Sequence, residues 1–229
     1  MSSSNRDQEI LRLVNTKGSV SIKDLAKATY ASPSTIRRDL EKLEQKGLLR
    51  RHHGGAESVL LFNPPRVVRK QHNQAEKNAV AQKAAALITP NSTIFIDAST
   101  TAQHMLPYLV GIEGLTVYTN GVDTALSLAR MKIPVVCTGG RLFSESMAFV
   151  GRVATSTVRN FIFDAVFFSS AGYDDNVISD WSEEETALRR AVMEQSLKKF
   201  FLADHTKKGK RYTHIVCRIT EIDKMIGDE

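Results

Sequence analysis

One segment of the chain, residues 32–55, carries hydroxyls, arginines and glycines in an order that suits contact with nucleic acid. Ser32 is a good N-cap, and the proline after it suits the first turn of a helix, where its missing N–H has no intrahelical partner. The helix that follows carries Arg37 and Arg38 on its polar face, and the basic run 50–53 then turns through two glycines. A helix of this kind, followed by a basic hairpin, is suited to entering a DNA major groove.

A second set of residues lies where apolar segments end in the second half of the chain. Hydroxyls and backbone N–H groups at the start of a helix favour a phosphate, because that helix end carries partial positive charge. We therefore predict that residues 99–101 hold a phosphate, that Asp97 and Asn120 bind sugar hydroxyls, and that Arg141 or Lys207 supplies charge. The candidate ligand-binding residues are Asp97, Ser99, Thr100, Thr101, Asn120, Gly139, Gly140, Arg141, Gly172, Asp204 and Lys207.

Each of these features also has a plainer interpretation. Residues 97–101 resemble an ordinary capped helix start, and Gly139–Gly140 resembles an ordinary turn. Polar residues at the ends of five strands in one domain favour a ligand site over these alternatives. A metal site is not expected at His52 and His53, because no Cys or carboxylate ligand stands beside them.

Three predicted helices position the first set. Apolar spacing predicts helices over residues 6–15 and 22–29 and after Ser32, with Ser21 as the cap of the second. Three helices and a basic hairpin within sixty residues describe a winged helix-turn-helix. The alternative is a plain packing module whose arginines form a solvated face, partly paired with glutamates of the same helix.

The second set is positioned by an expected α/β domain. From residue 93 onward, short apolar segments alternate with helical ones, and fully apolar strands imply burial on both faces. This pattern predicts a mostly parallel sheet between helices, which binds ligands at the carboxyl ends of its strands. One helix is predicted over residues 99–110. Another is predicted over 66–88, either as the first helix of this domain or as a dimer interface.

Length and charge agree with two domains. The chain has 229 residues and a net charge of +6. Residues 1–58 contain eleven Lys/Arg against seven Asp/Glu, and residues 59–80 contain four against one, so the positive charge lies where DNA contact is expected. We predict a winged helix-turn-helix at 1–58, a linker at 59–74 that includes the break Asn63-Pro64-Pro65, and an α/β sensing domain at 75–229.

The two cysteines indicate a reducing compartment. Cys137 and Cys217 are far apart and have no metal-type spacing, so reduced thiols in a cytoplasmic protein are expected. The N-terminus lacks an apolar signal core, and no apolar run is long enough to span a bilayer. No cofactor motif is evident.

The run STIRRDLEKLEQKGLLRRHHGGA closely resembles the N-terminal signature of DeoR-type bacterial transcriptional regulators, within a match that spans residues 6–58. In that family the recognition helix reads operator bases and the wing grips the neighbouring backbone. The resemblance implies that Ser34, Thr35 and Arg37 are candidate base readers. It also implies that Arg38, Arg50, Arg51, His52 and His53 contact phosphate or the minor groove, with Ser32 and Lys42 completing the set.

The second half resembles the DeoR-family sensor domain, which is similar to sugar-phosphate isomerases of the ribose-5-phosphate isomerase type. FIDASTT (95–101), TN (119–120), TGGR (138–141), SAG (170–172) and LADHTKKGK (202–210) carry this resemblance. It implies a phosphorylated sugar as effector, with its phosphate at Ser99 to Thr101. Two departures stand out: Ala98-Ser99 replaces a glycine that is usual in the family, and the segment 169–173 lacks the family's acid.

Three functions follow as alternatives. An isomerase needs a carboxylate base, but Asp174 and Asp175 fall outside the expected positions, so we do not expect an enzyme. An architectural DNA-binding protein with an inert second domain would not need polar residues at every strand end. We therefore predict a repressor of carbohydrate-metabolism genes that binds double-stranded operator DNA as a homo-oligomer (dimer or tetramer) and responds to a phosphorylated sugar.

Overall fold

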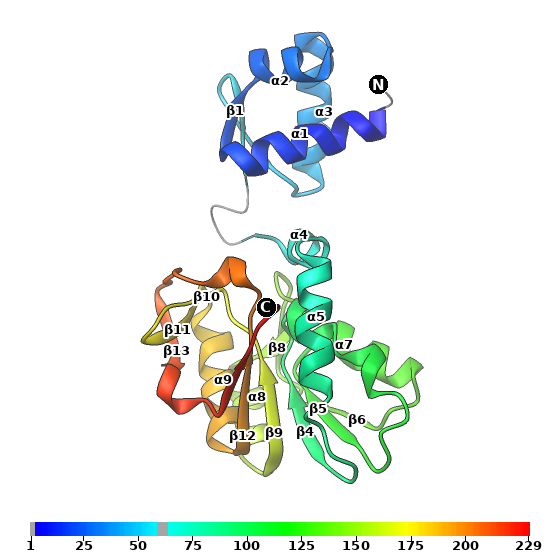
Figure 1. The fold of residues 1–229 in the computed structure, drawn as a ribbon, viewed down its shortest axis with the longest axis vertical. Helices are drawn as coiled ribbons and strands as arrows, with labels where there is room; N and C mark the ends of the chain where they lie inside the picture. Colours follow the sequence, from blue (N-terminus) through cyan, green and yellow to red (C-terminus); the bar gives the residue numbers. More distant parts are fainter. Residues whose placement is uncertain (1–2, 59–63) are drawn as a thin grey trace. The chain divides into compact units, whose positions relative to one another are not determined.

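The computed structural model describes residues 3–58 and 64–229, and it divides into two compact units between Gln71 and His72 (Figure 1). We call these the N-terminal and C-terminal units. The division falls inside the predicted linker, 59–74. Residues 59–63 of that linker, including Asn63 of the predicted break, lie outside the described residues.

The N-terminal unit is a winged helix-turn-helix, as predicted. Its elements are α1 (Ser3–Lys17), β1 (Ser19–Ser21), α2 (Ile22–Thr29), α3 (Pro33–Gln45), β2 (Arg50–His52), β3 (Gly55–Glu57) and α4 (Arg66–Gln71). The strands form an antiparallel sheet in the order β1-β3-β2. Ile10 of α1, Leu25 of α2 and Leu40 of α3 belong to one buried apolar cluster, so the three helices share a core.

Local signals set the helix boundaries of this unit. The Ser21 side chain accepts a hydrogen bond from the backbone N–H of Asp24 at the start of α2. Ser32 does the same for Thr35 at the start of α3, with Pro33 in the first turn. Gly47 follows α3 with a φ of 68°, a left-handed conformation that glycine adopts without strain. The predicted caps are therefore confirmed.

The C-terminal unit begins with α5 (Gln74–Ala85) and is built on a parallel sheet with the order β14-β12-β9-β4-β5-β6. The strands of this sheet are β4 (Thr93–Ile96), β5 (Thr116–Thr119), β6 (Val135–Cys137), β9 (Phe163–Phe168), β12 (Ser196–Leu202) and β14 (Lys224–Ile226). Two smaller antiparallel sheets contain β7 (Arg141–Phe143) with β8 (Ala148–Val150), and β10 (Gly172–Tyr173), β11 (Val177–Asp180) and β13 (His214–Arg218). The remaining helices are α6 (Thr100–Gln103), η2 (Leu106–Leu109), α7 (Val122–Arg130), α8 (Gly151–Val158), α9 (Glu183–Glu194), η3 (His205–Lys207) and η4 (Ile219–Glu221).

Helices cover both faces of the parallel sheet, as predicted (Figure 1). Ile94 and Ile96 of β4 belong to the apolar cluster under α5, η2 and α7, whereas Phe95 between them belongs to the cluster under α8 and α9. Successive side chains of a strand point to opposite faces, so a strand buried on both faces must be apolar throughout. All parallel strands end at one edge, which brings the loops after β4, β5, β9 and β12 together.

Two helix predictions need correction. The segment 66–88 is not one helix, because α4 and α5 are separated at Asn73, which has a left-handed φ of 53°. The Asn73 side chain donates a hydrogen bond to Asp204, which is far away in sequence. The predicted helix over 99–110 is one α-turn, α6, followed by the separate turn η2, which contains Pro107. Proline lacks the N–H that would continue an α-helix and disfavours helical backbone in the residue before it.

Candidate functional site

Hydroxyls gather at the start of the recognition helix α3. The Ser32 hydroxyl lies 2.8 Å from that of Ser34 and 2.9 Å from that of Thr35, and it also caps the helix. Ser34 is exposed, and Thr35 is half-buried. The three predicted hydroxyls therefore form one hydrogen-bonded group, in which Ser32 has a structural role as the cap.

Arg37 and Arg38 of α3 have exposed side chains. In the part of the chain that the structure describes, neither guanidinium forms a hydrogen bond or an ion pair, so the pairing of Arg37 with Glu41 that the sequence allows is not formed. A groove lined by Arg37, Arg51 and His52 joins this helix to the hairpin. The structure thus brings one predicted base reader, Arg37, and two predicted wing contacts to one groove.

Other predicted DNA contacts already have protein partners. The Arg51 guanidinium lies 2.6 Å from Glu44, and the Arg51 backbone N–H donates to the same carboxylate. The pKa of Glu44 is lowered by that backbone hydrogen bond and by the guanidinium. His52 Nε2 lies 3.0 Å from the Ser19 hydroxyl. These contacts fix the hairpin against α3 and β1.

The remaining predicted contacts lie on the same unit. Lys42 Nζ donates to Asp7 of α1 at 3.0 Å and keeps about half of its side chain exposed. Arg50 and His53 are exposed on the hairpin. A contact that sequence analysis did not predict, between Arg6 Nε and Asp39 at 2.6 Å, ties α1 to the buried side of α3. It holds the recognition helix in place.

In the C-terminal unit, Lys207 brings three strand ends together. Its Nζ donates to the Ser169 hydroxyl at 2.6 Å and to the Thr101 hydroxyl at 3.3 Å. Thr101 follows β4, Ser169 follows β9 and Lys207 follows β12. An ammonium beside two hydroxyls is a suitable subsite for an anionic ligand. We call these three residues the lysine cluster.

Asp204 borders the lysine cluster. Its side chain is the N-cap of η3, and its Oδ1 accepts hydrogen bonds from Thr206 N at 3.2 Å and from Asn73 Nδ2 at 3.1 Å. Burial acts to raise the pKa of Asp204, but the charge of Lys207 and hydrogen bonds from the Thr206 hydroxyl and the Asn73 side-chain amide outweigh it and lower the pKa. Asp204 therefore carries a negative charge directly behind the candidate anion subsite.

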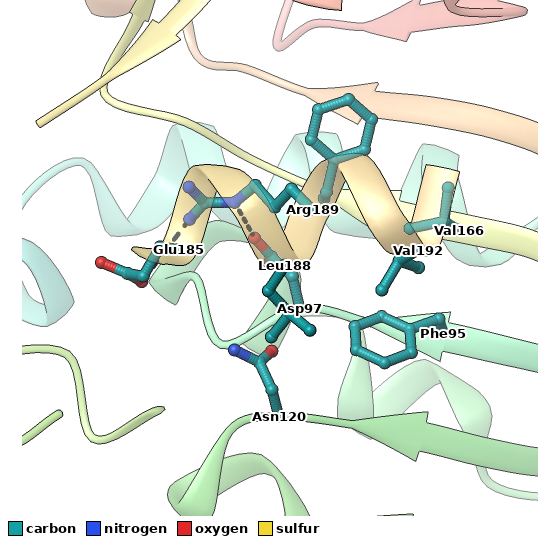
Figure 2. Close-up of a pocket in the computed structure, with 9 residues that line it drawn as sticks. Phe95, Asp97, Asn120, Val166, Glu185, Leu188, Arg189 and Val192 are labelled. Atoms are coloured by element: carbon teal, nitrogen blue, oxygen red, sulfur yellow. Dashed lines mark hydrogen bonds and ion pairs between the residues drawn. The ribbon is translucent and has the colours of Figure 1, made fainter. Parts of the chain in front are cut away.

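Asp97 is part of a buried ion-pair network (Figure 2). Arg189 of α9 donates to Asp97 at 2.9 Å and to Asp180 at 2.8 Å, and it lies 3.6 Å from Glu185. All four side chains are less than 10% exposed. Burial acts to lower the pKa of Arg189, but the three carboxylates outweigh it and raise the pKa.

The oxygens of Asp97 are largely engaged. Oδ1 accepts a hydrogen bond from Ser99 N at 3.0 Å, and Oδ2 accepts from Ser169 N at 3.4 Å in addition to Arg189. Its predicted contact with a sugar hydroxyl stays a prediction, and the contacts shown are those that position the loop after β4. The same network lines a cavity of about 10 Å³, room for one water at most.

Asn120 and Ser99 also organise loops. Asn120 Oδ1 accepts a hydrogen bond from Ala98 N at 3.0 Å, and its Nδ2 donates to the Phe149 carbonyl at 3.3 Å. The Ser99 hydroxyl caps α6 by accepting from Ala102 N. Thr100 is buried in the same turn. Because α6 has only four residues, its dipole adds less to anion binding than the predicted longer helix would.

The predicted glycines and Arg141 lie further around the same edge. A Cβ on Gly140 would be 2.8 Å from the Val150 carbonyl, and one on Gly172 would be 2.6 Å from that of Lys210, so neither position accepts a larger residue. Gly139 is open on its outer side. Arg141 is exposed and is paired with Glu184. The structure thus separates Arg141 from the lysine cluster by pairing it elsewhere.

Several residues of this region were not predicted from the sequence. Arg189 contacts Asp97 and Ser169 contacts Lys207 directly, and Asp180 joins them through Arg189. Only the Glu185–Arg189 spacing of four within a helix was a visible signal. Within residues 3–58 and 64–229, no three His, Cys, Asp or Glu side chains are grouped as a metal site requires. No helix described here combines the length and apolar character needed to cross a membrane.

Two family models match the chain. One is described as a DeoR-like helix-turn-helix domain and matches residues 6–60, and the other is described as a DeoR C terminal sensor domain and matches residues 72–229. The resemblance inferred from the sequence is confirmed in both halves.

Relatives match over nearly the whole chain. The chain is 34% identical to the uncharacterized HTH-type transcriptional regulator YulB of Bacillus subtilis, covering 97% of this chain and 88% of the relative. It is 34% identical to the HTH-type transcriptional regulator GolR of Listeria innocua, with 97% and 89% covered. It is 31% identical to the lactose phosphotransferase system repressor of Staphylococcus aureus, with 100% and 93% covered. These relatives are transcriptional regulators and not enzymes.

Solved structures share the fold over part of the chain. The delta subunit of eIF2B from Chaetomium thermophilum has a TM-score of 0.53 at 12% identity, covering 71% of this chain and 59% of that one. Ribose 5-phosphate isomerase A from Methanocaldococcus jannaschii has a TM-score of 0.44 at 14% identity, covering 59% and 55%. The likeness to the eIF2B subunit concerns the fold alone.

Proposed function

Since the chain belongs to the DeoR family of transcriptional regulators, we propose that it represses genes of carbohydrate metabolism and that a phosphorylated sugar modulates its binding to operator DNA. The lactose phosphotransferase system repressor is a relative over the full length of this chain, which supports both the direction of regulation and the class of genes. Operator DNA of a bacterium lies in the cytoplasm, where such a repressor acts.

The contacts of Arg37 and Arg51 support different roles for these two residues at the DNA. Arg37 is exposed and has no partner among the described residues, so its guanidinium is available for a bidentate contact with a guanine. Arg51 is held by Glu44, a geometry that suits a fixed contact to the phosphate backbone. The protein acts as a homo-oligomer, a dimer or a tetramer, whose paired units read half-sites about one helical turn (~34 Å) or a multiple apart.

The observation that carries the effector proposal is the lysine cluster. Lys207 places its ammonium at 2.6 Å from Ser169 and 3.3 Å from Thr101, at the strand edge where parallel sheets bind ligands. The Ser169 hydroxyl donates to the Leu202 carbonyl at 2.6 Å and positions the ammonium, so the donors proposed for a phosphate are Lys207 and the Thr101 hydroxyl. A phosphate group offers the acceptor oxygens and the charge that these two donors match. The sugar would extend from there toward Asn120 and the Gly139–Gly140 turn.

The test is fluorescence anisotropy of labelled DNA from upstream of the protein's own gene, titrated with protein and then with a panel of sugar phosphates. One compound is expected to change the DNA Kd by about 5- to 150-fold, the usual range of allosteric coupling. Lys207→Met should abolish this response, and Lys208→Met, an exposed neighbour, should retain it. Sequence-selective DNA binding that ignores the whole panel would refute the effector proposal.

A further inference from the structure

The turn that opens the C-terminal unit is held by contacts far from it in sequence. Asn73 has φ 53° and ψ 46°, a left-handed conformation, and its side chain makes no capping hydrogen bond to α5. Its Nδ2 instead donates to Asp204 Oδ1 at 3.1 Å and to Thr206 Oγ1 at 2.9 Å. Left-handed backbone is less unfavourable for asparagine than for most residues, but it still needs support from its surroundings. These two contacts provide it.

Lys77 supports the same turn from α5. Its side chain is 4% exposed, and its Nζ donates to the His72 carbonyl at 2.6 Å. The charge of Lys77 also helps to keep the pKa of Asp204 low. The turn is therefore held at two points. Lys77, whose charge interacts with Asp204, holds the His72 carbonyl, and Asp204 itself accepts a hydrogen bond from Asn73.

Asp204 faces the lysine cluster on its other side. It caps η3, the turn that carries Lys207, and Lys207 is the strongest attraction that keeps Asp204 ionised. Asp204 is 1% exposed, so charges around it are poorly screened by water. A phosphate near Lys207 would add nearly two negative charges beside the ammonium that attracts the Asp204 carboxylate.

We propose, on the basis of the proposed function, that Asp204 couples ligand binding to the first residues of the C-terminal unit. Phosphate at Lys207 displaces Asp204 and weakens its contact with Asn73. His72 is the first residue of this unit, and the chain runs from it through α4 toward the DNA-binding helices. A change at His72–Asn73 therefore alters the segment that connects the two units, through chain connectivity alone.

The experiment is hydrogen–deuterium exchange on the full-length protein with and without saturating inorganic phosphate. Phosphate should slow exchange in residues 203–210 and speed exchange of the backbone amides of residues 72–78. Asn73→Gly keeps the left-handed backbone but removes the side-chain amide. In this variant the backbone amides of residues 72–78 should exchange fast even without phosphate and show no further change when phosphate is added. Asn91→Gly is the matched control, because Asn91 is also left-handed (φ 57°) and lies outside this turn.

A second variant tests the role of charge in this coupling. Asn73→Asp places a carboxylate against Asp204, so the amides of residues 72–78 should exchange at the fast rate without phosphate. Phosphate protection of residues 203–210 with unchanged exchange at 72–78 in the wild type would overturn the coupling and leave the effector site standing. Absence of protection at 203–210 would overturn the phosphate subsite itself, and the coupling with it.

Discussion

The two polar surfaces differ in how their charges are engaged before a ligand arrives. On α3, Arg37 and Arg38 are exposed and have no partner in the described part of the chain. At the sheet edge, Arg189 and Lys207 are held by carboxylates and hydroxyls. DNA can therefore contact Arg37 and Arg38 without breaking a described protein contact, whereas a ligand at Lys207 would have to exchange with existing ones. If the proposed function holds, that difference makes the lysine cluster the responsive site.

The largest expected effect comes from breaking the buried network. Arg189→Met would leave Asp97, Asp180 and Glu185 buried together without a cation, which costs about 3–5 kcal/mol. Urea unfolding should show this loss in the C-terminal unit. Arg38→Met, made on the exposed surface, should change stability by less than about 0.5 kcal/mol. Equal losses in both variants would contradict the comparison.

The next effect concerns base reading. Arg37→Ala should weaken operator binding by about 1–3 kcal/mol and relax the base preference at one position, because a bidentate contact to guanine is lost. Binding to a set of single-base operator variants measures this. Thermal stability should stay unchanged, since Arg37 has no protein contact to lose among the described residues. A uniform loss across all operator variants would reassign Arg37 to the phosphate backbone.

A smaller effect is expected in the lysine cluster. Thr101→Val removes the hydroxyl beside Lys207 at nearly constant volume and should weaken phosphate binding by about 1 kcal/mol, roughly fivefold. Calorimetric titration with inorganic phosphate measures it. Thr124→Val is the matched control, because the Thr124 hydroxyl is buried and has no hydrogen-bond partner in the described residues. If both variants bound phosphate alike, Thr101 would not be a ligand residue.

The smallest effect tests the paired cation of the wing. Arg51→Ala should weaken binding to all DNA sequences alike, by no more than about 1 kcal/mol, and lower the salt slope by about one. The Kd across a range of salt concentrations gives that slope. A sequence-selective loss would show that Arg51 reads bases despite its contact with Glu44.

Local signals account for what the sequence predicted. Ser21 and Ser32 cap their helices through residues three positions away, and β4 alternates between two apolar faces. Such features depend on neighbours in sequence, which periodicity and propensity describe. The winged helix-turn-helix and the parallel sheet follow from them.

Partners that are far apart in sequence account for the contacts that sequence analysis did not predict. Asp97 and Arg189 are 92 residues apart, and Asn73 and Asp204 are 131 apart. No spacing rule links such positions, so Asp97 was predicted as a ligand residue and Asn73 as the middle of a helix. The helix break at Asn73 and the ion pair of Asp97 each involve a buried carboxylate whose partner is set by the tertiary fold. The first corrects the predicted helix, whereas the ligand role of Asp97 stays a prediction.

The central claim is that DNA and a sugar phosphate bind two coupled sites on one chain. Isothermal titration calorimetry of the active sugar phosphate, with and without saturating operator DNA, tests it most directly. Linkage requires the ligand Kd to change with DNA by the same factor by which the ligand changes the DNA Kd. Equal ligand affinity with and without operator DNA would contradict the account.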